Sequence, residues 1–118
     1  MPKFMLLYVS GGGPDWSALS PEEMSKAQEA VMAWWSPIRD AGRVVSEGRL
    51  DGPASAKTIR KRPDGKVTVT DGPFIEAKEH LGGYAIVDVP DRDAAIEIAR
   101  TSPFLNMIEI RPVVETRD

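Results

Sequence analysis

Residues 71–84, with the sequence DGPFIEAKEHLGGY, hold the densest set of side chains in this chain that could take part in chemistry. They include the only histidine, four charged residues, an aromatic residue and a pair of glycines. A histidine beside a carboxylate can move protons, because imidazole titrates near working pH. The segment therefore predicts His80 and Glu76 as acid–base groups, with ligand contacts from Asp71, Phe74, Lys78 and Glu79.

The same segment also has a structural interpretation. Asp71 can accept a hydrogen bond within its own turn, Gly72 can adopt a positive φ, and Pro73 stiffens the chain. Phe74 would then anchor the turn in the core, so residues 71–74 need no ligand to explain them. Residues 76–80 could be solvated at a strand entrance or could line a cleft, and both roles remain open.

Composition restricts the classes of function. A chain of 118 residues can bury one core, and we expect a single domain over residues 1–118. The net charge of −3 argues against nucleic-acid binding, and the absence of cysteine excludes disulfides, zinc–thiolate sites and a cysteine nucleophile. No segment approaches the roughly 20 apolar residues of a membrane span. We therefore expect a soluble cytoplasmic protein.

Two other patterns could suggest a metal or cofactor. Gly11-Gly12-Gly13 precedes a helix but lacks the lysine and the glycine spacing of a phosphate-binding loop. Asp88, Asp91 and Asp93 are explained more simply by helix capping at Asp91. We accordingly predict no metal and no cofactor.

The elements that must position these groups can be read from the spacing of apolar residues. Residues 3–9 are apolar on both alternating faces, which predicts a strand covered on both sides. A helix should begin after Ser20, with Glu23 completing a capping box, and should end at Gly42. Pro37 predicts a kink or a break in this helix. Trp34 and Trp35 point about 100° apart, so we expect one in the core and the other at its border, where it could line an apolar pocket.

The second half of the chain continues with strands and one more helix. We expect a strand over residues 43–50 with a bulge at Gly48, a hairpin over 56–70 that turns at Pro63-Asp64-Gly65, and strands over 83–89 and 107–114 around a helix from 91 to about 100. Glu47 with Arg49, and Glu109 with Arg111, could form ion pairs on the outer face of the sheet.

This order, β-α-β-hairpin-β-α-β, predicts an α+β fold: a ferredoxin-like βαββαβ sandwich with an inserted β-hairpin. That fold places the first and third core strands at the centre of the sheet, and these strands are the two with apolar residues on both faces. The sheet face away from the helices would then be apolar and uncovered in a monomer. We therefore expect a homodimer in which two sheets pack face to face.

Segments spread along most of the chain resemble the DGPF branch of the YCII-related family, at residues 5–7, 19–24, 48–60, 69–84, 89–90 and 109–113. The resemblance implies a ferredoxin-like fold that pairs into a dimeric α/β barrel, with a cleft between sheets and helices. It further implies acid–base chemistry by a paired histidine and aspartate, and lyase activity on ring compounds in some members. In this chain Val31 or Met32 stands at the position of that histidine and Ser102 at that of the aspartate, so the dyad is lost.

Two functions remain open. The first is a cofactor-free lyase or isomerase that uses the charged residues of segment 71–84 in a dimer-associated cleft. The second is a non-catalytic accessory or interaction domain that keeps the barrel without the dyad. In either case we expect a homodimer with a possible small-molecule ligand, and neither a nucleic acid nor a membrane as partner.

Overall fold

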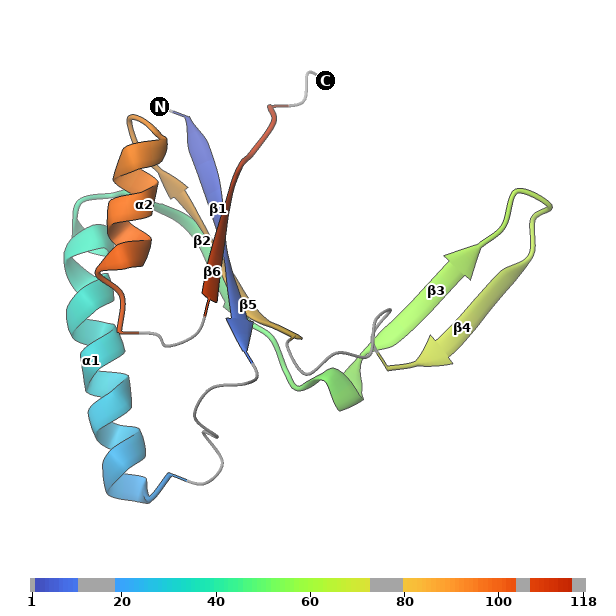
Figure 1. Cartoon of the computed structure of the whole chain (residues 1–118), viewed down its shortest axis with the longest axis horizontal. Coiled ribbons are helices and arrows are strands. Elements are labelled where there is room, and N and C mark those ends of the chain that lie inside the picture. Colours follow the sequence, from blue (N-terminus) through green and yellow to red (C-terminus); the bar gives the residue numbers. More distant parts are fainter. Residues whose placement is uncertain (1, 11–18, 73–79, 104–106, 116–118) are drawn as a thin grey trace.

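The computed structural model describes residues 2–10, 19–72, 80–103 and 107–115 of an α+β fold (Figure 1). The elements follow the predicted order: β1 (Lys3–Ser10), α1 (Pro21–Asp40), β2 (Val44–Arg49), the short 3-10 helix η2 (Pro53–Ser55), β3 (Lys57–Lys61), β4 (Val67–Asp71), β5 (His80–Asp88), α2 (Arg92–Arg100) and β6 (Met107–Pro112). No helix within these described ranges is long and apolar enough to span a bilayer.

Four strands form an antiparallel sheet in the spatial order β2-β5-β1-β6, which is the ferredoxin-like arrangement. The central strands are β1 and β5, as their apolar residues on both faces predict. Both helices lie on one side of this sheet (Figure 1). Strands β3 and β4 form a separate two-stranded sheet, which is the predicted hairpin.

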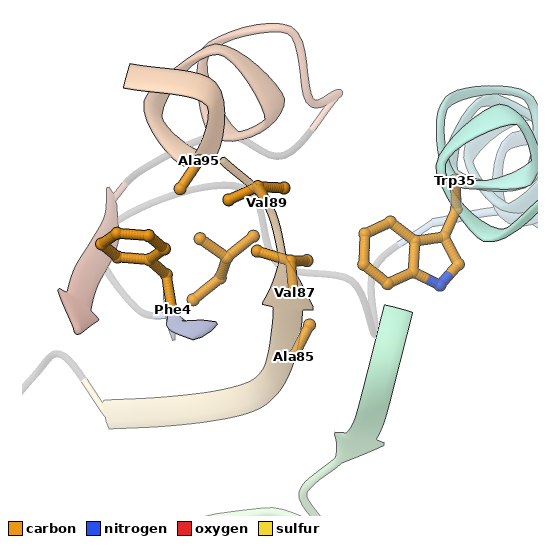
Figure 2. Packing of buried hydrophobic residues seen from close by; sticks show 7 residues of the cluster. Phe4, Trp35, Ala85, Val87, Val89 and Ala95 are labelled. Carbon is orange, nitrogen blue, oxygen red and sulfur yellow. The ribbon is translucent and has the colours of Figure 1, made fainter. Parts of the chain in front are cut away.

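The core lies between the sheet and the two helices. Figure 2 shows Trp35 extending from α1 toward Val87 and Val89 of the sheet layer. On β6, Ile108 and Ile110 pack against the core, whereas the alternating residues Met107, Glu109 and Arg111 are exposed. The fully or nearly fully buried cluster consists of Phe4, Leu6, Trp35, Ala85, Val87, Val89 and Ala95.

Helix α1 begins at the predicted capping box. The Glu23 amide donates to the Ser20 hydroxyl (3.1 Å), and the Ser20 amide donates to the Glu23 carboxylate (3.3 Å). Each of these two bonds satisfies an amide that the first helical turn leaves without an intrahelical partner. The start of α1 is therefore determined by local sequence.

The end of α1 differs from the prediction at one residue. Of the kink or break predicted at Pro37, the break is wrong, because the helix continues to Asp40, and the kink stays a prediction. A proline in the last turn removes only one intrahelical hydrogen bond, and the Ala41 amide still donates to the Pro37 carbonyl (3.1 Å). Gly42, at φ 72°, then ends the helix as predicted.

Strand β2 contains a bulge, but not at the predicted glycine. The pairing with β5 shifts register between Val44 and Ser46, whereas Gly48 pairs regularly with Tyr84. A Cβ atom at Gly48 would lie 2.6 Å from Cε1 of the Tyr84 ring. The glycine is therefore required by the packing of a neighbouring ring and not by a bulge.

Candidate functional site

Much of the predicted site lies outside the described residues: Phe74, Glu76, Lys78 and Glu79 belong to that part of the chain. Asp71 is described, and it is exposed at the end of β4. Its carboxylate pairs with the Lys57 ammonium across the hairpin. The residues that follow Gly72 in the expected turn lie outside the described part of the chain, so the hydrogen bond predicted there stays a prediction. Gly72 has the predicted positive φ, at 89°, and its carbonyl accepts a hydrogen bond from the Thr58 hydroxyl (2.7 Å).

His80 is the first residue of β5 and is half-buried. It pairs with Ser10, while Gly83 pairs with Tyr8 two residues earlier along β1. Side chains alternate between faces along a strand, and paired residues of an antiparallel ladder share a face. His80 therefore lies on the same face as Tyr8, which is the face that the helices cover.

Two charged residues of β2 lie on this helix-covered face as well. Glu47 pairs with the core residue Ala85, and Arg49 pairs with Gly83. The expectation that Glu47 and Arg49 form an ion pair on the outer face is therefore wrong. The bulge before Ser46 adds a residue to the strand and reverses the face of those that follow. The corresponding expectation for β6 is confirmed, since Glu109 and Arg111 pair with each other at 2.8 Å.

Glu47 connects β2 to helix α1. Its carboxylate accepts a hydrogen bond from the Arg39 guanidinium in the last turn of the helix. Both side chains are substantially exposed, so this pair contributes little to stability. Its main effect is to hold a carboxylate in place between α1 and the sheet.

Tyr8 is the most strongly perturbed titratable group among those described. Burial raises the pKa of the Tyr8 phenol, and the nearby negative charge of Glu47 raises it further. Both causes disfavour the phenolate. Tyr8 therefore keeps its proton at neutral pH and can donate a hydrogen bond, but it cannot act as a base.

A glycine makes room for Tyr8. A Cβ atom at Gly83 would lie 3.4 Å from Cδ2 of the Tyr8 ring and 2.9 Å from the carbonyl oxygen of Gly48. The Tyr8 ring thus lies beside Gly83 of β5, where no side chain occupies the space. Along β5 this position lies between Ala85, which pairs with Glu47, and His80. Gly83, the second glycine of the pair in segment 71–84, therefore has a structural role here.

The two tryptophans border the same region from α1. Trp35 is only 5% exposed and Trp34 is half-buried, which confirms the predicted core and border positions. Their rings stack, with centroids 4.9 Å apart. The indole nitrogen of Trp34 donates to the Ile98 carbonyl (3.0 Å), whereas that of Trp35 is buried without a hydrogen-bond partner among the described residues. In Figure 2 the Trp35 nitrogen points away from the apolar core cluster and toward β2.

The arrangement therefore combines hydrogen-bond donors, a carboxylate, cations and an aromatic border on one side of the sheet. Sequence reasoning missed Tyr8, because its position in the alternation with Phe4 and Leu6 predicts only a core residue. It also assigned Glu47 to the opposite face. Alternation alone cannot reveal a bulge, so no sequence signal separated this carboxylate from a surface residue.

The described residues contain no group of three or more His, Cys, Asp or Glu side chains placed to hold a metal ion. Asp91 instead caps α2, as predicted, by accepting a hydrogen bond from the Ala94 amide (2.9 Å). The positions at which the resemblance places the histidine and aspartate of the dyad carry no acid–base group. Val31 is half-buried, Met32 is exposed, and Ser102 follows the end of α2.

Comparison with known proteins agrees with this fold. Residues 7–117 match the family model of the YCII-related domain. An uncharacterized protein of Rhizobium meliloti (strain 1021) is 33% identical over 101 residues, and the match covers 82% of this chain and 81% of that protein.

Proposed function

We propose that this chain, which belongs to the YCII-related family, is a homodimer that binds a small ring compound on the helix-covered face of its sheet. One observation carries the proposal. Tyr8, Glu47, Arg49 and His80 come from three different strands and share the face that is otherwise apolar core. Polar groups at the border of an apolar layer are typical of a small-molecule site.

The side chains indicate the chemistry of the ligand. Tyr8 and the indole nitrogen of Trp35 can donate hydrogen bonds, and Arg49 carries a positive charge. We therefore infer a ring compound with a carboxylate or carbonyl oxygen, its ring lying against the tryptophans.

A cofactor-free lyase or isomerase would need a base and a proton donor at this site. His80 or Glu47 could accept a proton, and Tyr8 could stabilise a developing oxyanion by donating a hydrogen bond while it keeps its proton. Glu76, Lys78 and Glu79 precede His80 in the chain and remain predicted members of the same site. Asp71 and Phe74 remain predicted ligand contacts.

The accessory-domain alternative is favoured by a specific observation. Val31 and Met32 on α1 and Ser102 after α2 supply no proton acceptor where the dyad of related proteins would lie. Under this alternative the chain would bind a ligand or partner without converting it. Binding and turnover therefore have to be measured separately.

Ligand binding can be tested with a set of aromatic and alicyclic carboxylic acids. We expect at least one of them to shift the ring resonances of His80 in NMR, which are free of overlap because the chain has one histidine. Tyr8→Phe and Glu47→Gln should each weaken its binding by about threefold to tenfold, as the loss of a hydrogen bond or charge does. Glu29→Gln, on the exposed side of α1, is the matched control and should bind like the wild type.

The outcomes separate the two functions. Turnover by the wild type that disappears in His80→Gln, with binding retained, would establish an enzyme. Saturable binding without turnover would establish the accessory function. If no compound in the set binds, or if Tyr8→Phe and Glu29→Gln bind equally well, the site does not lie on this face.

The proposed dimer uses the opposite face of the sheet. Met5, Leu7 and Ile86 are only half-buried there, although they lie on the two central strands. Leu81 and Met107 add exposed apolar surface to the same face, because they pair with Val9. The patch is bordered on β6 by the Glu109–Arg111 ion pair, which lies beside Leu7 and Met5. An apolar patch with a charged border is typical of an interface between copies.

A further inference from the structure

The hairpin of residues 57–71, here called the arm, exposes an apolar stripe. Ile59 pairs with Val69 and Lys61 pairs with Val67, so the three apolar side chains share one face. Ile59 is 61% exposed, Val69 is 62% exposed and Val67 is 56% exposed. Lys61 and the Lys57–Asp71 ion pair flank the stripe on the same face. The other face carries only polar residues, Thr58, Arg60, Thr68 and Thr70. A hairpin of two strands is marginally stable in water on its own, so the apolar face needs cover.

The position of the arm indicates what covers it. Figure 1 shows the arm extending from the rest of the chain on the side of the sheet opposite the two helices. That is the side of the uncovered apolar sheet face described above. A body that packs against this sheet face therefore approaches the arm as well.

Charge provides an independent argument for the identity of that body. The arm contains five basic residues and two acidic ones, a net charge of +3, while the whole chain carries −3. The remainder of the chain accordingly carries −6. A second copy thus presents a predominantly acidic body to a basic arm, and opposite charges favour their association.

We propose that the arm of each subunit docks its Ile59–Val69 face on the body of a second copy of this chain. The inference rests on the proposed homodimer and adds a second contact to it, beyond the packing of the two sheets. Isolated copies would leave both apolar surfaces in water, whereas one two-fold dimer covers both. The arm then holds the two subunits together through a second contact, which favours this dimer over other ways of pairing two copies.

Photo-crosslinking can test this directly, because the chain has no cysteine and single cysteines can be introduced for labelling. Val69→Cys and Thr68→Cys are neighbours on β4 that lie on opposite faces of the arm, so each is a control for the other. Both would be labelled with a benzophenone maleimide and mixed with unlabelled, affinity-tagged wild-type chain. We expect crosslinks from position 69 to the tagged copy and few from position 68.

A second pair of variants measures the same contact as a dissociation constant. Val69→Lys should weaken the dimer by about tenfold or more, because a buried interface position then carries an unpaired charge. Thr68→Lys adds the same charge on the polar face and should change the constant by less than about threefold. Circular dichroism on both variants would verify that they fold.

The results distinguish this inference from the dimer on which it rests. A stable dimer in which positions 68 and 69 crosslink equally, or only within their own chain, would overturn the proposed contact of the arm and leave the proposed dimer standing. A wild-type chain that stays monomeric would overturn both. Crosslinking of position 69 to an added DNA duplex, in place of the second copy, would identify the arm as a nucleic-acid contact and would also overturn the proposal.

Discussion

Tyr8 and the glycine beside it show how a polar group comes to lie within an otherwise apolar layer. The phenol sits where Phe4 and Leu6 would predict another core side chain, and its ring lies beside Gly83. Burial and the Glu47 charge together keep the phenol protonated. At the scale of single residues, the candidate site depends on Tyr8, whose phenol is kept protonated by its surroundings, and on Gly83, which leaves room for the Tyr8 ring.

The raised pKa of Tyr8 predicts a loss of stability at alkaline pH. Below the ordinary tyrosine pKa of about 10, both the folded and unfolded states hold the proton, and the contribution of Tyr8 is fully present. As the pH rises above that value the unfolded state ionises first, so stability falls until the raised pKa of the folded state is passed. Urea denaturation between about pH 9 and pH 11 should therefore show a steeper decline for the wild type than for Tyr8→Phe.

Tyr84→Phe is the control for this experiment, since it removes the other tyrosine and leaves Tyr8 in place. It should retain the steep decline of the wild type. If Tyr8→Phe declines as steeply as the wild type, the phenol is not protected from ionisation in the folded protein.

Gly83 should tolerate substitution poorly. Gly83→Ala places a Cβ atom 2.9 Å from the Gly48 carbonyl oxygen, and this neighbour is backbone and cannot rotate away. We expect a cost of about 1–3 kcal/mol in the free energy of unfolding, as overpacked sites show. Gly52→Ala is the control, because nothing lies within 4 Å of the position that its Cβ atom would take and its φ of −59° suits any residue. Equal stability of the two variants in urea would contradict the close packing of β2 on β5.

At the scale of elements, helix α1 is defined at both ends by local chemistry, and it carries three groups of the site region: Trp34, Trp35 and Arg39. The capping box fixes where it starts, and the positive φ of Gly42 fixes where the chain turns back into β2. The bulge in β2 then decides which of its side chains face the helix. The end of α1 places Arg39, and the bulge in β2 places Glu47, so that the two side chains form an ion pair.

Loss of the N-terminal cap should therefore destabilise the whole fold modestly. Ser20→Ala removes the hydroxyl that accepts from the Glu23 amide, and substitutions of this kind cost about 1 kcal/mol. Ser25→Ala, at an exposed position inside the same helix, should be neutral or slightly stabilising, since alanine has the higher helix propensity. Thermal denaturation that ranks the two variants in the opposite order would show that the cap does not stabilise the helix in solution.

At the scale of the whole molecule, the two faces of the sheet differ in what covers them. One face is covered by the helices and holds both the core and the proposed site. The other carries apolar side chains on β1 and β5 that no described element covers. The arm extends from that second side, so assembly and ligand binding are assigned to opposite faces.

The assembly can be tested by light scattering after gel filtration. The wild type should be a dimer at micromolar concentration, and Leu7→Lys should be a monomer, because the charge falls at the centre of the uncovered face. Glu29→Lys adds the same charge to the exposed side of α1 and should remain a dimer. A wild-type monomer at this concentration would contradict the proposed assembly.

Local sequence was enough to establish most of the element order and the ferredoxin-like sheet. Helix caps, the Pro63-Asp64-Gly65 turn and the alternation along β1, β5 and β6 act over a few residues, so their effects can be read locally. The positions of Trp34 and Trp35 followed from helical geometry in the same way. His80 was recognised because it is the only histidine.

Contacts between strands determine which polar side chains lie close together. The bulge between Val44 and Ser46 places Glu47 on the helix-covered face. The pairing of Gly83 with Tyr8 places the Tyr8 phenol on that same face. Both depend on strands that are distant in sequence, and a shift of one residue in register moves every following side chain to the other face. Local pattern can therefore identify a strand, whereas the site is determined by how the strands are aligned against one another.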